Sequence, residues 1–439
     1  MQTNVGLLGY GTVGAGVAKI ISLEDSLLSQ KVGWPLKLAR AVVRDLSGRR
    51  SFPAPPGLLT TDPSEVVGNP GIQVVVEVMG GLEPARTLVL RALEAGQHVV
   101  TANKALLAVH GREIFETAAQ SRREVAFEAA VAGAIPVIRT LKEGLAANRI
   151  QSVAGILNGT TNYILTKMSR GGAGFAATLK EAQELGFAEA DPTTDVEGTD
   201  AAHKLILLTA LAYGVLPTLD DIHAEGITGL EPEDFSFAEA LGYVIKLLAQ
   251  ASLNSGDGRL EVRLHPTMIP RGHLLAGVSG AMNAVMIRGH ASGDIFLSGA
   301  GAGMMPTASA VVGDIVEIAR LARSESGLSK PSLGWHSLKA ETVKPASEIW
   351  SRYYLRFSVL DRPGVLASLA GILARHDVSI AQMIQKGPDA AAAGESVRLV
   401  MLTHSAPAKS IRAALGETGG KEWCRGPARL LRVEDFAQG

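Results

Sequence analysis

Asp200 and Lys204 form the pair of residues in this sequence whose types and spacing most clearly indicate chemistry. They stand four apart in a predicted helix, so both side chains lie on one face, which continues as an apolar stripe through Leu207, Leu208 and Leu211. A solvated ion pair would not point along an apolar stripe, so we interpret them as a buried functional pair rather than a surface pair. Burial lowers the pKa of a lysine and nearby carboxylates raise it, and a proton donor to a developing alkoxide needs that balance.

Two further charged residues lie close to apolar runs. Lys104 follows the predicted strand His98–Thr101, at the carboxyl end, where doubly wound sheets bind ligands. Glu128 is the only acid in the run Phe127–Pro136, so its charge needs a partner or a cation. On residue type alone, an isolated lysine at the position of Lys104 would usually be solvated, and Glu128 is more typical of a structural acid than of a catalytic one.

A glycine-rich turn near the N-terminus predicts a phosphate-binding site. Its GxGxxG motif follows the apolar run Val5–Leu8 and precedes a helical pattern. The first glycine permits a tight turn, the second lets the backbone approach a pyrophosphate, and the third lets helix and strand pack closely. The predicted cofactor contacts are Gly9, Tyr10, Gly11, Thr12, Val13 and Gly14. A glycine-rich turn without a ligand is the alternative.

The end of the second predicted strand bears on the choice of coenzyme. An NAD-preferring site carries an acid there for the ribose hydroxyls, whereas this chain has Arg44, with Asp45 beside it. An arginine suits a 2′-phosphate, so we expect NADP(H) to be preferred. Asp45 keeps NAD(H) possible.

The elements that must position these residues follow from the apolar pattern, which predicts an α/β protein. In residues 1–132, strands are expected at Asn4–Leu8, Leu36–Val43, Val74–Val78, His98–Thr101 and Glu124–Phe127, and helices at Val13–Ile21, Glu83–Ala95 and Gly111–Arg122. This alternation predicts a doubly wound, Rossmann-type domain.

The rest of the chain predicts two more domains. Longer helices and scattered strands over 133–299 indicate an α+β domain, and the Ser-, Pro- and Gly-rich stretch 326–350 indicates a flexible linker. Residues 351–435 follow the order βαββαβ, a ferredoxin-like arrangement. In this last domain Asp361 is expected to cap a helix, and the turn Asp361–Gly364 to face an anion such as an amino-acid carboxylate.

Composition excludes several classes of function. Forty-two Lys and Arg against 43 Asp and Glu give a net charge of −1, and no basic stretch is long enough to follow a phosphate backbone, so we expect no nucleic-acid partner. The single cysteine, Cys424, cannot form an internal disulfide, and the histidines show no zinc-binding spacing. The sequence shows neither a signal peptide nor an apolar run of membrane-spanning length. We expect a soluble, cytoplasmic protein with no membrane contact.

The motifs, in this order, resemble those of the homoserine dehydrogenase family in the form with a C-terminal ACT domain. The resemblance rests on GLLGYGTVGAGV, VVTANKALLA, FEAAVAGAIPVI, GILNGTTNYIL, GFAEADPTTDVEGTDAAHK and GAGAGMMPTASAVVGD. It implies NAD(P)-dependent interconversion of L-homoserine and L-aspartate 4-semialdehyde in threonine, methionine and isoleucine biosynthesis. It also implies that 133–299 serves catalysis and dimerisation in a homodimer or homotetramer, and that a segment at about 300–325 returns to the nucleotide domain.

The resemblance also implies a role for individual residues. The catalytic residues would be Lys204 as proton donor with Lys104 and Asp200, and the substrate contacts Glu189, Asp195, Asp200 and Lys204. Lys104, Gly186 and Gly301 would add cofactor contacts, and Glu128 with the carbonyls of Val131, Gly133 and Ile135 would hold a monovalent cation, sodium being the expected ion. Ala134 stands where the family often has glycine.

Three alternatives remain open at this point. The ACT domain is expected to bind L-threonine as an inhibitor, but it could be an assembly module without a ligand. The enzyme could be another NAD(P)-dependent oxidoreductase acting on an amino or keto acid. The chain could instead be a catalytically inactive amino-acid sensor, although a scaffold would not need to keep Lys104, Glu189, Asp200 and Lys204.

Overall fold

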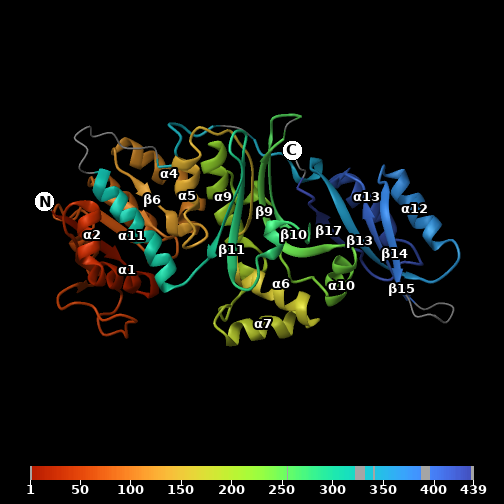
Figure 1. Ribbon diagram of the computed structural model, residues 1–439, viewed down its shortest axis with the longest axis horizontal. Helices are drawn as coiled ribbons and strands as arrows, with labels where there is room; N and C mark the ends of the chain where they lie inside the picture. Colours follow the sequence, from red (N-terminus) through yellow and green to blue (C-terminus); the bar gives the residue numbers. More distant parts are fainter. Residues whose placement is uncertain (1, 255, 322–331, 340–341, 387–395, 437–439) are drawn as a thin grey trace. The chain divides into compact units, whose positions relative to one another are not determined.

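The computed structural model describes residues 2–254, 256–321, 332–339, 342–386 and 396–436 (Figure 1). The chain divides into two compact units. The first contains Met1–Gly159, Thr199–Asp220 and Ala281–Glu341, and the second contains Thr160–Gly198, Asp221–Gly280 and Thr342–Gly439.

A six-stranded parallel sheet forms the N-terminal part of the first unit. Across the sheet its strands are β3 (Leu59–Thr60), β2 (Leu36–Val42), β1 (Thr3–Leu8), β4 (Val74–Glu77), β5 (His98–Thr101) and β6 (Val125–Ala126). Every neighbouring pair is parallel, and the strand order changes direction between β1 and β4. Ligands of doubly wound sheets bind at such a switch point, beyond the carboxyl ends of the strands. The predicted doubly wound fold is therefore confirmed.

Helices complete this nucleotide-binding fold. They are α1 (Thr12–Leu23), α2 (Asp25–Val32), α3 (Ala85–Glu94), α4 (Lys104–Gln120) and, from much later in the chain, α11 (Met304–Leu321). In Figure 1, α11 (cyan) lies beside α1 (red), and Ala308 and Ile315 of α11 share one buried core with Ala15 and Ala18 of α1. A segment nearly 300 residues away in sequence thus fixes the helix that follows the glycine-rich turn.

The remainder of the first unit contains the helix that carries Asp200 and Lys204. This helix, α9 (Thr199–Tyr213), is buried on almost every side, which explains why its sequence is apolar around its whole circumference. Strands β12 (Gly293–Ala300), β11 (Met282–Gly289) and β7 (Ile150–Ile156) pair antiparallel in that order. Short helical segments lie between strands of the first unit: η1 (Pro63–Glu65) lies between β3 and β4, and η2 (Glu128–Ala130), α5 (Val137–Arg139) and the π-helical η3 (Thr140–Gly144) lie between β6 and β7.

In the second unit, strands pair side by side in the order β9, β10, β17, β13, β15, β14. These strands span Tyr243–Leu253, Leu260–Pro270, Arg429–Val433, Trp350–Leu360, Ser396–Thr403 and Ile380–Lys386 respectively, and the short strands β8 (His223–Ala224) and β16 (Ala406–Pro407) pair with β10 and β13. Its helices are α6 (Gly159–Gly171, which begins in the first unit), α7 (Phe175–Glu184), α8 (Thr193–Val196), α10 (Pro232–Ala240), α12 (Val365–Arg375) and α13 (Ala408–Gly419). The last strand, β17, is parallel to β10 through Thr267 and Met268 and antiparallel to β13.

The predicted βαββαβ order is present as β13, α12, β14, β15, α13 and β17. Alternate residues of β13, including Leu355 and Phe357, form one apolar core with Leu369 and Ile372 of α12 and Ile411 of α13. The ferredoxin-like fold predicted for the C-terminal domain is confirmed.

Several local predictions were wrong. Helix α4 begins at Lys104 rather than Gly111, because the Asn103 side chain accepts a hydrogen bond from Leu106 N (3.1 Å) and caps it there. Asp361 does not cap α12, whose N-cap is Gly364 in a left-handed conformation without a side-chain hydrogen bond. No strand was predicted at β9, whose mostly buried and mostly apolar run, interrupted by Lys246 and Gln250, reads equally well as helix or strand.

The described end of the predicted linker is also not free. Of residues 326–350, those at 326–331, 340 and 341 lie outside the described residues. Val343 forms a parallel β-bridge with Leu260, the Lys344 side chain is buried, and β13 already begins at Trp350. The segment that leads into the ACT fold is packed on β10.

Candidate active site

The Asp200 carboxylate and the Lys204 ammonium are in contact one helical turn apart on α9. Lys204 Nζ lies 2.7 Å from Asp200 Oδ2 and also donates to the carbonyl oxygen of Leu157, at 2.7 Å. The Asn158 side chain donates to the same Asp200 oxygen at 2.8 Å. Both charged side chains are about nine-tenths buried, so the pairing that the spacing predicts is present and is internal.

A second lysine approaches the same carboxylate. Lys104, the first residue of α4, places its Nζ 3.1 Å from Asp200 Oδ1, so each carboxylate oxygen faces a different ammonium. Lys104 keeps 38% of its side chain exposed, whereas Lys204 keeps 10%. Lys104 can therefore contact an incoming molecule, whereas Lys204 is held in the interior.

The electrostatics of this group favour bound anions. Burial by itself would raise the pKa of Asp200, but the Lys204 and Lys104 charges and the hydrogen bonds from Lys204 and Asn158 hold that pKa well below its ordinary value. Burial lowers the pKa of the adjacent His203, the Asp200 charge raises it and the two lysine charges lower it, and the net shift is downward. Two ammonium groups and one carboxylate leave one net positive charge for a negatively charged oxygen.

The glycine-rich turn has the geometry that a phosphate site needs. Gly9 has φ +107°, and a Cβ on it would meet the Val78 carbonyl oxygen at 2.8 Å; a Cβ on Gly14 would lie 2.3 Å from the Gly9 carbonyl oxygen. Gly11, the N-cap of α1, has open space where its side chain would be. Backbone and helix N-terminus are thus accessible there to a pyrophosphate. Tyr10 differs from its neighbours, since its ring lies in the apolar core.

Arg44 and Asp45 follow the end of β2 as exposed residues. The Asp45 carboxylate accepts hydrogen bonds from Ser47 Oγ (2.7 Å) and Ser47 N (2.8 Å), and these bonds lower its pKa. The Asp45 carboxylate is therefore already hydrogen-bonded within the turn that follows β2.

Glu128 has protein partners for its buried carboxylate. Its oxygens accept hydrogen bonds from the backbone N–H groups of Ile138 (2.8 Å) and Arg139 (3.0 Å), while its own N–H donates to Asp314 Oδ2 (2.9 Å). Burial raises the pKa of Glu128 and raises that of Asp314 to about 8. Two buried carboxylates therefore lie close together, with the Arg139 guanidinium beside them.

Gly133 and Gly301 lie against each other in the first unit. Gly133 has φ +58°, and a Cβ there would approach the Gly301 carbonyl oxygen to 2.5 Å; the next residue, Ala134, donates its N–H to Ala300 O (3.1 Å). The loop after Glu128, which carries Val131, Gly133 and Ile135, is thus attached to the end of β12.

The remaining predicted site residues belong to the second unit. Gly186, with φ +75°, and Glu189 are exposed in the loop after α7, and the partly buried Asp195 lies in α8. Gln183 donates a hydrogen bond to the Glu189 carbonyl oxygen (3.1 Å). Lys104, Asp200 and Lys204 all belong to the first unit.

Two asparagines complete the site and were not assigned from sequence. Asn158 holds Asp200, and Asn283 donates to the same Leu157 carbonyl oxygen as Lys204, at 3.0 Å. Asn158 lies within the motif GILNGTTNYIL, directly after a strand, which was the available signal. Nothing near Asn283 in the sequence indicates its contact with Leu157, 126 residues away.

A doubly wound sheet with a glycine-rich turn at its switch point, together with a carboxylate held between two lysines, defines a nicotinamide-dependent oxidoreductase. The comparisons with known proteins specify it further. Residues 136–316 match the family model of homoserine dehydrogenase, residues 9–128 that of the homoserine dehydrogenase NAD-binding domain, and residues 353–419 the ACT domain.

Relatives match over the whole chain. The homoserine dehydrogenase of Neisseria gonorrhoeae is 45% identical over 99% of both chains, and that of Pseudomonas aeruginosa is 44% identical over 98% of this chain and 99% of the other. The crystal structure of a homoserine dehydrogenase from Thiobacillus denitrificans, 44% identical, matches with a TM-score of 0.91 over 100% of this chain and 99% of that one. A hyperthermophilic archaeal homoserine dehydrogenase mutant in complex with NADPH matches with a TM-score of 0.62 and 28% identity, over 74% of this chain and all of the other.

The chain belongs to the homoserine dehydrogenase family, in the form that carries an ACT domain. It is an NAD(P)-dependent oxidoreductase that acts on the CH–OH group, interconverting L-homoserine and L-aspartate 4-semialdehyde in amino-acid biosynthesis. The family predicted from the motifs is confirmed. In the part of the chain that the structure describes, no helix is long and apolar enough to cross a membrane.

Proposed function

We propose that Lys204 is the proton donor when the aldehyde is reduced and the proton acceptor when homoserine is oxidised. The observation that carries this assignment is the position of its ammonium, which donates one hydrogen to Asp200 and one to the Leu157 carbonyl. An ammonium has three N–H donors, so one remains for the substrate oxygen. A bound nicotinamide supplies or accepts the hydride.

The other charged residues prepare this proton transfer. Asp200 keeps Lys204 oriented and its charge compensated, as a partner to a general acid must. Lys104 adds a second positive charge that stabilises the alkoxide. Glu189 and Asp195 are proposed to bind the substrate, whose ammonium suits a carboxylate partner.

For the coenzyme we propose a preference for NADP(H), with NAD(H) possible. Arg44 pairs with the 2′-phosphate, and Asp45, which is engaged with Ser47, does not compete for the ribose. The glycine-rich turn holds the pyrophosphate, and Lys104, Gly186 and Gly301 are further cofactor contacts.

A monovalent cation, sodium, is proposed at Glu128 with the carbonyl oxygens of Val131, Gly133 and Ile135. The Glu128 and Asp314 side chains are buried close together, and burial raises the pKa of both, so a cation bound there would compensate their charge when both are ionised. Glu128 Oε1 accepts a hydrogen bond from Ile138 N and Oε2 accepts one from Arg139 N, which leaves each oxygen a further lone pair for an ion.

We propose that L-threonine is the amino-acid effector, that it inhibits through the ACT domain, and that the enzyme is a cytoplasmic homodimer or homotetramer. The support for the effector is the turn Asp361–Gly364 at the start of α12, where backbone N–H groups are available to a carboxylate.

Replacing Lys204 by Ala tests the central assignment. We expect turnover in both directions to fall about 100-fold or more, with NADPH binding nearly unchanged. Lys180→Ala, which removes an exposed lysine paired with Glu184, is the matched control. Turnover of Lys204→Ala within a few-fold of the parent would show that the lysine is only structural.

A further inference from the structure

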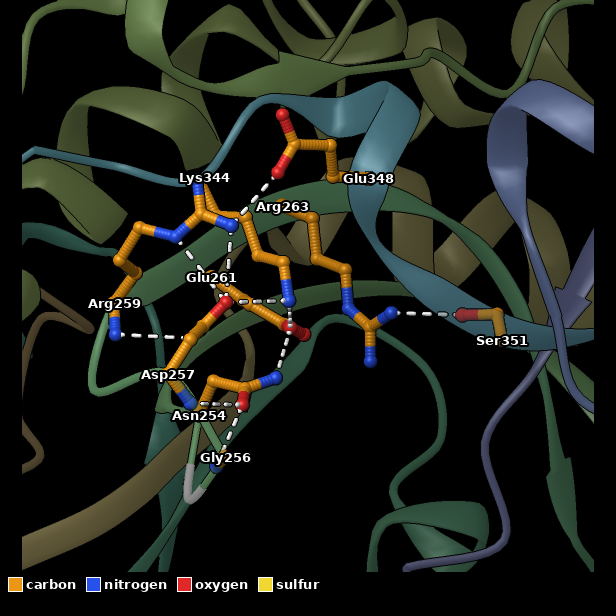
Figure 2. Close-up of polar contacts among 9 residues, drawn as sticks. All are labelled: Asn254, Gly256, Asp257, Arg259, Glu261, Arg263, Lys344, Glu348 and Ser351. Atoms are coloured by element: carbon orange, nitrogen blue, oxygen red, sulfur yellow. Dashed lines mark hydrogen bonds and ion pairs between the residues drawn. The ribbon is translucent and has the colours of Figure 1, made fainter.

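A row of charged side chains joins β10 to the segment that leads into the ACT fold (Figure 2). Arg259, Glu261 and Arg263 are alternate residues, so their side chains lie on one face of the β9–β10 hairpin. Each of the three contacts a different residue of the segment 344–351: Glu348, Lys344 and Ser351 respectively. The three contacts follow one another along the hairpin, whereas on the segment the central contact is made by its first residue, Lys344.

Lys344 occupies the centre of this row. Its Nζ lies 3.1 Å from Glu261 Oε1 and 3.2 Å from Asp257 Oδ2, and its side chain is only 7% exposed. Its backbone N–H donates to the carbonyl oxygen of Leu260 at 2.7 Å. Asn254 donates to the same Glu261 oxygen at 2.7 Å, so the hairpin itself holds the carboxylate in position. Removing one partner of such a buried pair leaves the other charge uncompensated.

On either side of Lys344, two arginines of the hairpin contact residues of the segment 344–351, and one of them also contacts a residue near β17. Arg259 Nη2 lies 2.7 Å from Glu348 Oε2 and 3.0 Å from Asp257 Oδ2, so Asp257 connects the outer and central contacts. Arg263 donates to Ser351 Oγ (2.8 Å) and to Glu434 Oε2 (2.8 Å), just beyond β17. The row thus contacts both the first and the last strand of the ACT fold.

Strand β13 connects this row with the turn proposed to receive the effector. The strand begins at Trp350, beside Ser351, and ends at Leu360, immediately before Asp361. The hairpin, in turn, lies within residues 136–316, which match the homoserine dehydrogenase family model. A shift of β13 along its own axis would therefore act directly on the Arg263–Ser351 hydrogen bond and, through residues 344–349, on the ion pairs of Lys344 and Glu348.

We propose that Lys344, paired with Glu261 and Asp257, is a latch through which the state of the ACT domain is transmitted to the β9–β10 hairpin. This inference rests on the proposed regulation by an amino acid. The latch has two states, engaged or broken, because a buried ammonium that leaves its carboxylates must find solvent. An effector that favours one state changes the hairpin through this contact.

The test compares the full-length parent with Lys344→Met and Glu261→Gln, with Lys180→Met as the exposed-lysine control. Homoserine oxidation is measured against L-threonine concentration, and threonine binding is measured by calorimetry. In both latch variants we expect basal turnover within about twofold of the parent, threonine still bound, and inhibition weakened at least about fivefold, the lower end of typical allosteric coupling. Inhibition curves equal to the parent's would overturn the proposal.

A second measurement separates the latch from the identity of the effector. Amide hydrogen exchange is followed without ligand over 256–270 and 342–360. If breaking the latch uncouples two cooperating segments, exchange in Lys344→Met rises in both together. A rise confined to 342–349 would make Lys344 a local anchor and refute the latch. If the parent neither binds nor responds to threonine, the proposed regulation fails, while this measurement still decides the latch.

Discussion

Asp200 accepts a 2.7 Å hydrogen bond from Lys204, one turn further along the same helix, and both side chains are almost fully buried. An i, i+4 ion pair on a helix surface contributes only a few tenths of a kcal/mol. Inside the protein the same pair is expensive to desolvate, and it is kept because Lys104 and Asn158 satisfy the remaining positions of the carboxylate. This arrangement makes the charge of Asp200, and not only its shape, important for catalysis.

Replacing Asp200 by Asn should therefore reduce turnover substantially. The amide keeps an acceptor for Lys204 but removes the charge that compensates two lysines, so we expect a fall of about 10-fold or more in kcat in both directions. Asp191→Asn, at an exposed acid of the same segment, is the control and should stay close to the parent. A parental kcat for Asp200→Asn, measured by NADPH oxidation, would contradict this account.

Arg44→Asp should change the preference between coenzymes. Loss of a charge-assisted contact to the 2′-phosphate costs roughly 1.5 to 3 kcal/mol, so the KM for NADPH should rise about 10-fold or more, while the KM for NADH changes little. Arg49→Asp places the same charge change at a nearby exposed arginine and should affect the two coenzymes equally. Equal rises for both coenzymes in Arg44→Asp would remove Arg44 from the site.

Lys246 should make folding stability rise with pH in the alkaline range. Its buried Nζ donates to two neutral acceptors, Asn162 Oδ1 (3.0 Å) and the Val278 carbonyl oxygen, and burial, with the charge of Arg170, lowers its pKa from 10.5 to about 8. Between pH 8 and 10.5 the folded state has lost this proton while the unfolded state keeps it, so stability increases, by up to roughly 3 kcal/mol. Urea unfolding across this range should show the increase in the parent and lack it in Lys246→Met.

Lys344 offers an internal contrast for that experiment. Burial alone would lower its pKa, but the hydrogen bonds and charges of Glu261 and Asp257 raise it above 10.5. Its contribution is fully present below pH 10.5 and is lost as the pH rises further. The pH dependences removed by Lys246→Met and Lys344→Met should therefore have opposite signs, and equal signs would refute the assignment of the two environments.

Arg356→Met should destabilise the protein strongly. The Arg356 guanidinium lies 2.8 Å from the fully buried Asp234 on α10, and removing it takes away the positive charge beside that carboxylate and leaves it the neutral donors Tyr354 OH and Glu231 N. Breaking such a buried pair costs about 3 to 5 kcal/mol. Arg398→Met, which removes an exposed arginine paired with Glu233, should cost about 1 kcal/mol or less in the same unfolding experiment. Similar losses for both would show that burial of Asp234 has no special energetic consequence.

The same contacts change the expected result of deleting the ACT domain. The sequence predicts that the ACT domain is a separable module beyond a flexible linker. Removal of everything following Ala346 should then leave an active, threonine-insensitive dehydrogenase. In the structure that deletion also removes Arg356 from Asp234 and β17 from β10. We expect the truncated chain to unfold at a clearly lower temperature than the parent, which thermal unfolding can measure. An unchanged unfolding temperature would restore the picture of a separable module.

The sequence pattern predicted the features that depend on residues close together in the chain. It did not predict contacts between residues that are far apart in the chain. The spacing of Asp200 and Lys204 is a property of one helix, and the strand at His98–Thr101 has the predicted bounds. The approach of Lys104 to Asp200 joins residues 96 apart, and no periodicity encodes it. The Asp361 cap failed because Gly364 takes that position itself. The packing of the end of the linker could not be predicted, because in the sequence a buried Lys344 cannot be distinguished from a solvated lysine.

The position of β17 also determines when this protein can finish folding. Its partner on one side, β10, ends at Pro270, whereas β17 begins at Arg429, close to the end of the chain. At roughly 5 to 20 residues per second, a ribosome needs on the order of ten seconds or more to make the intervening residues. Throughout that time the edge of β10 at Thr267 and Met268 lacks its partner β17, and an unpaired strand edge promotes aggregation. A fragment that ends before Arg429 lacks the strand that covers this edge.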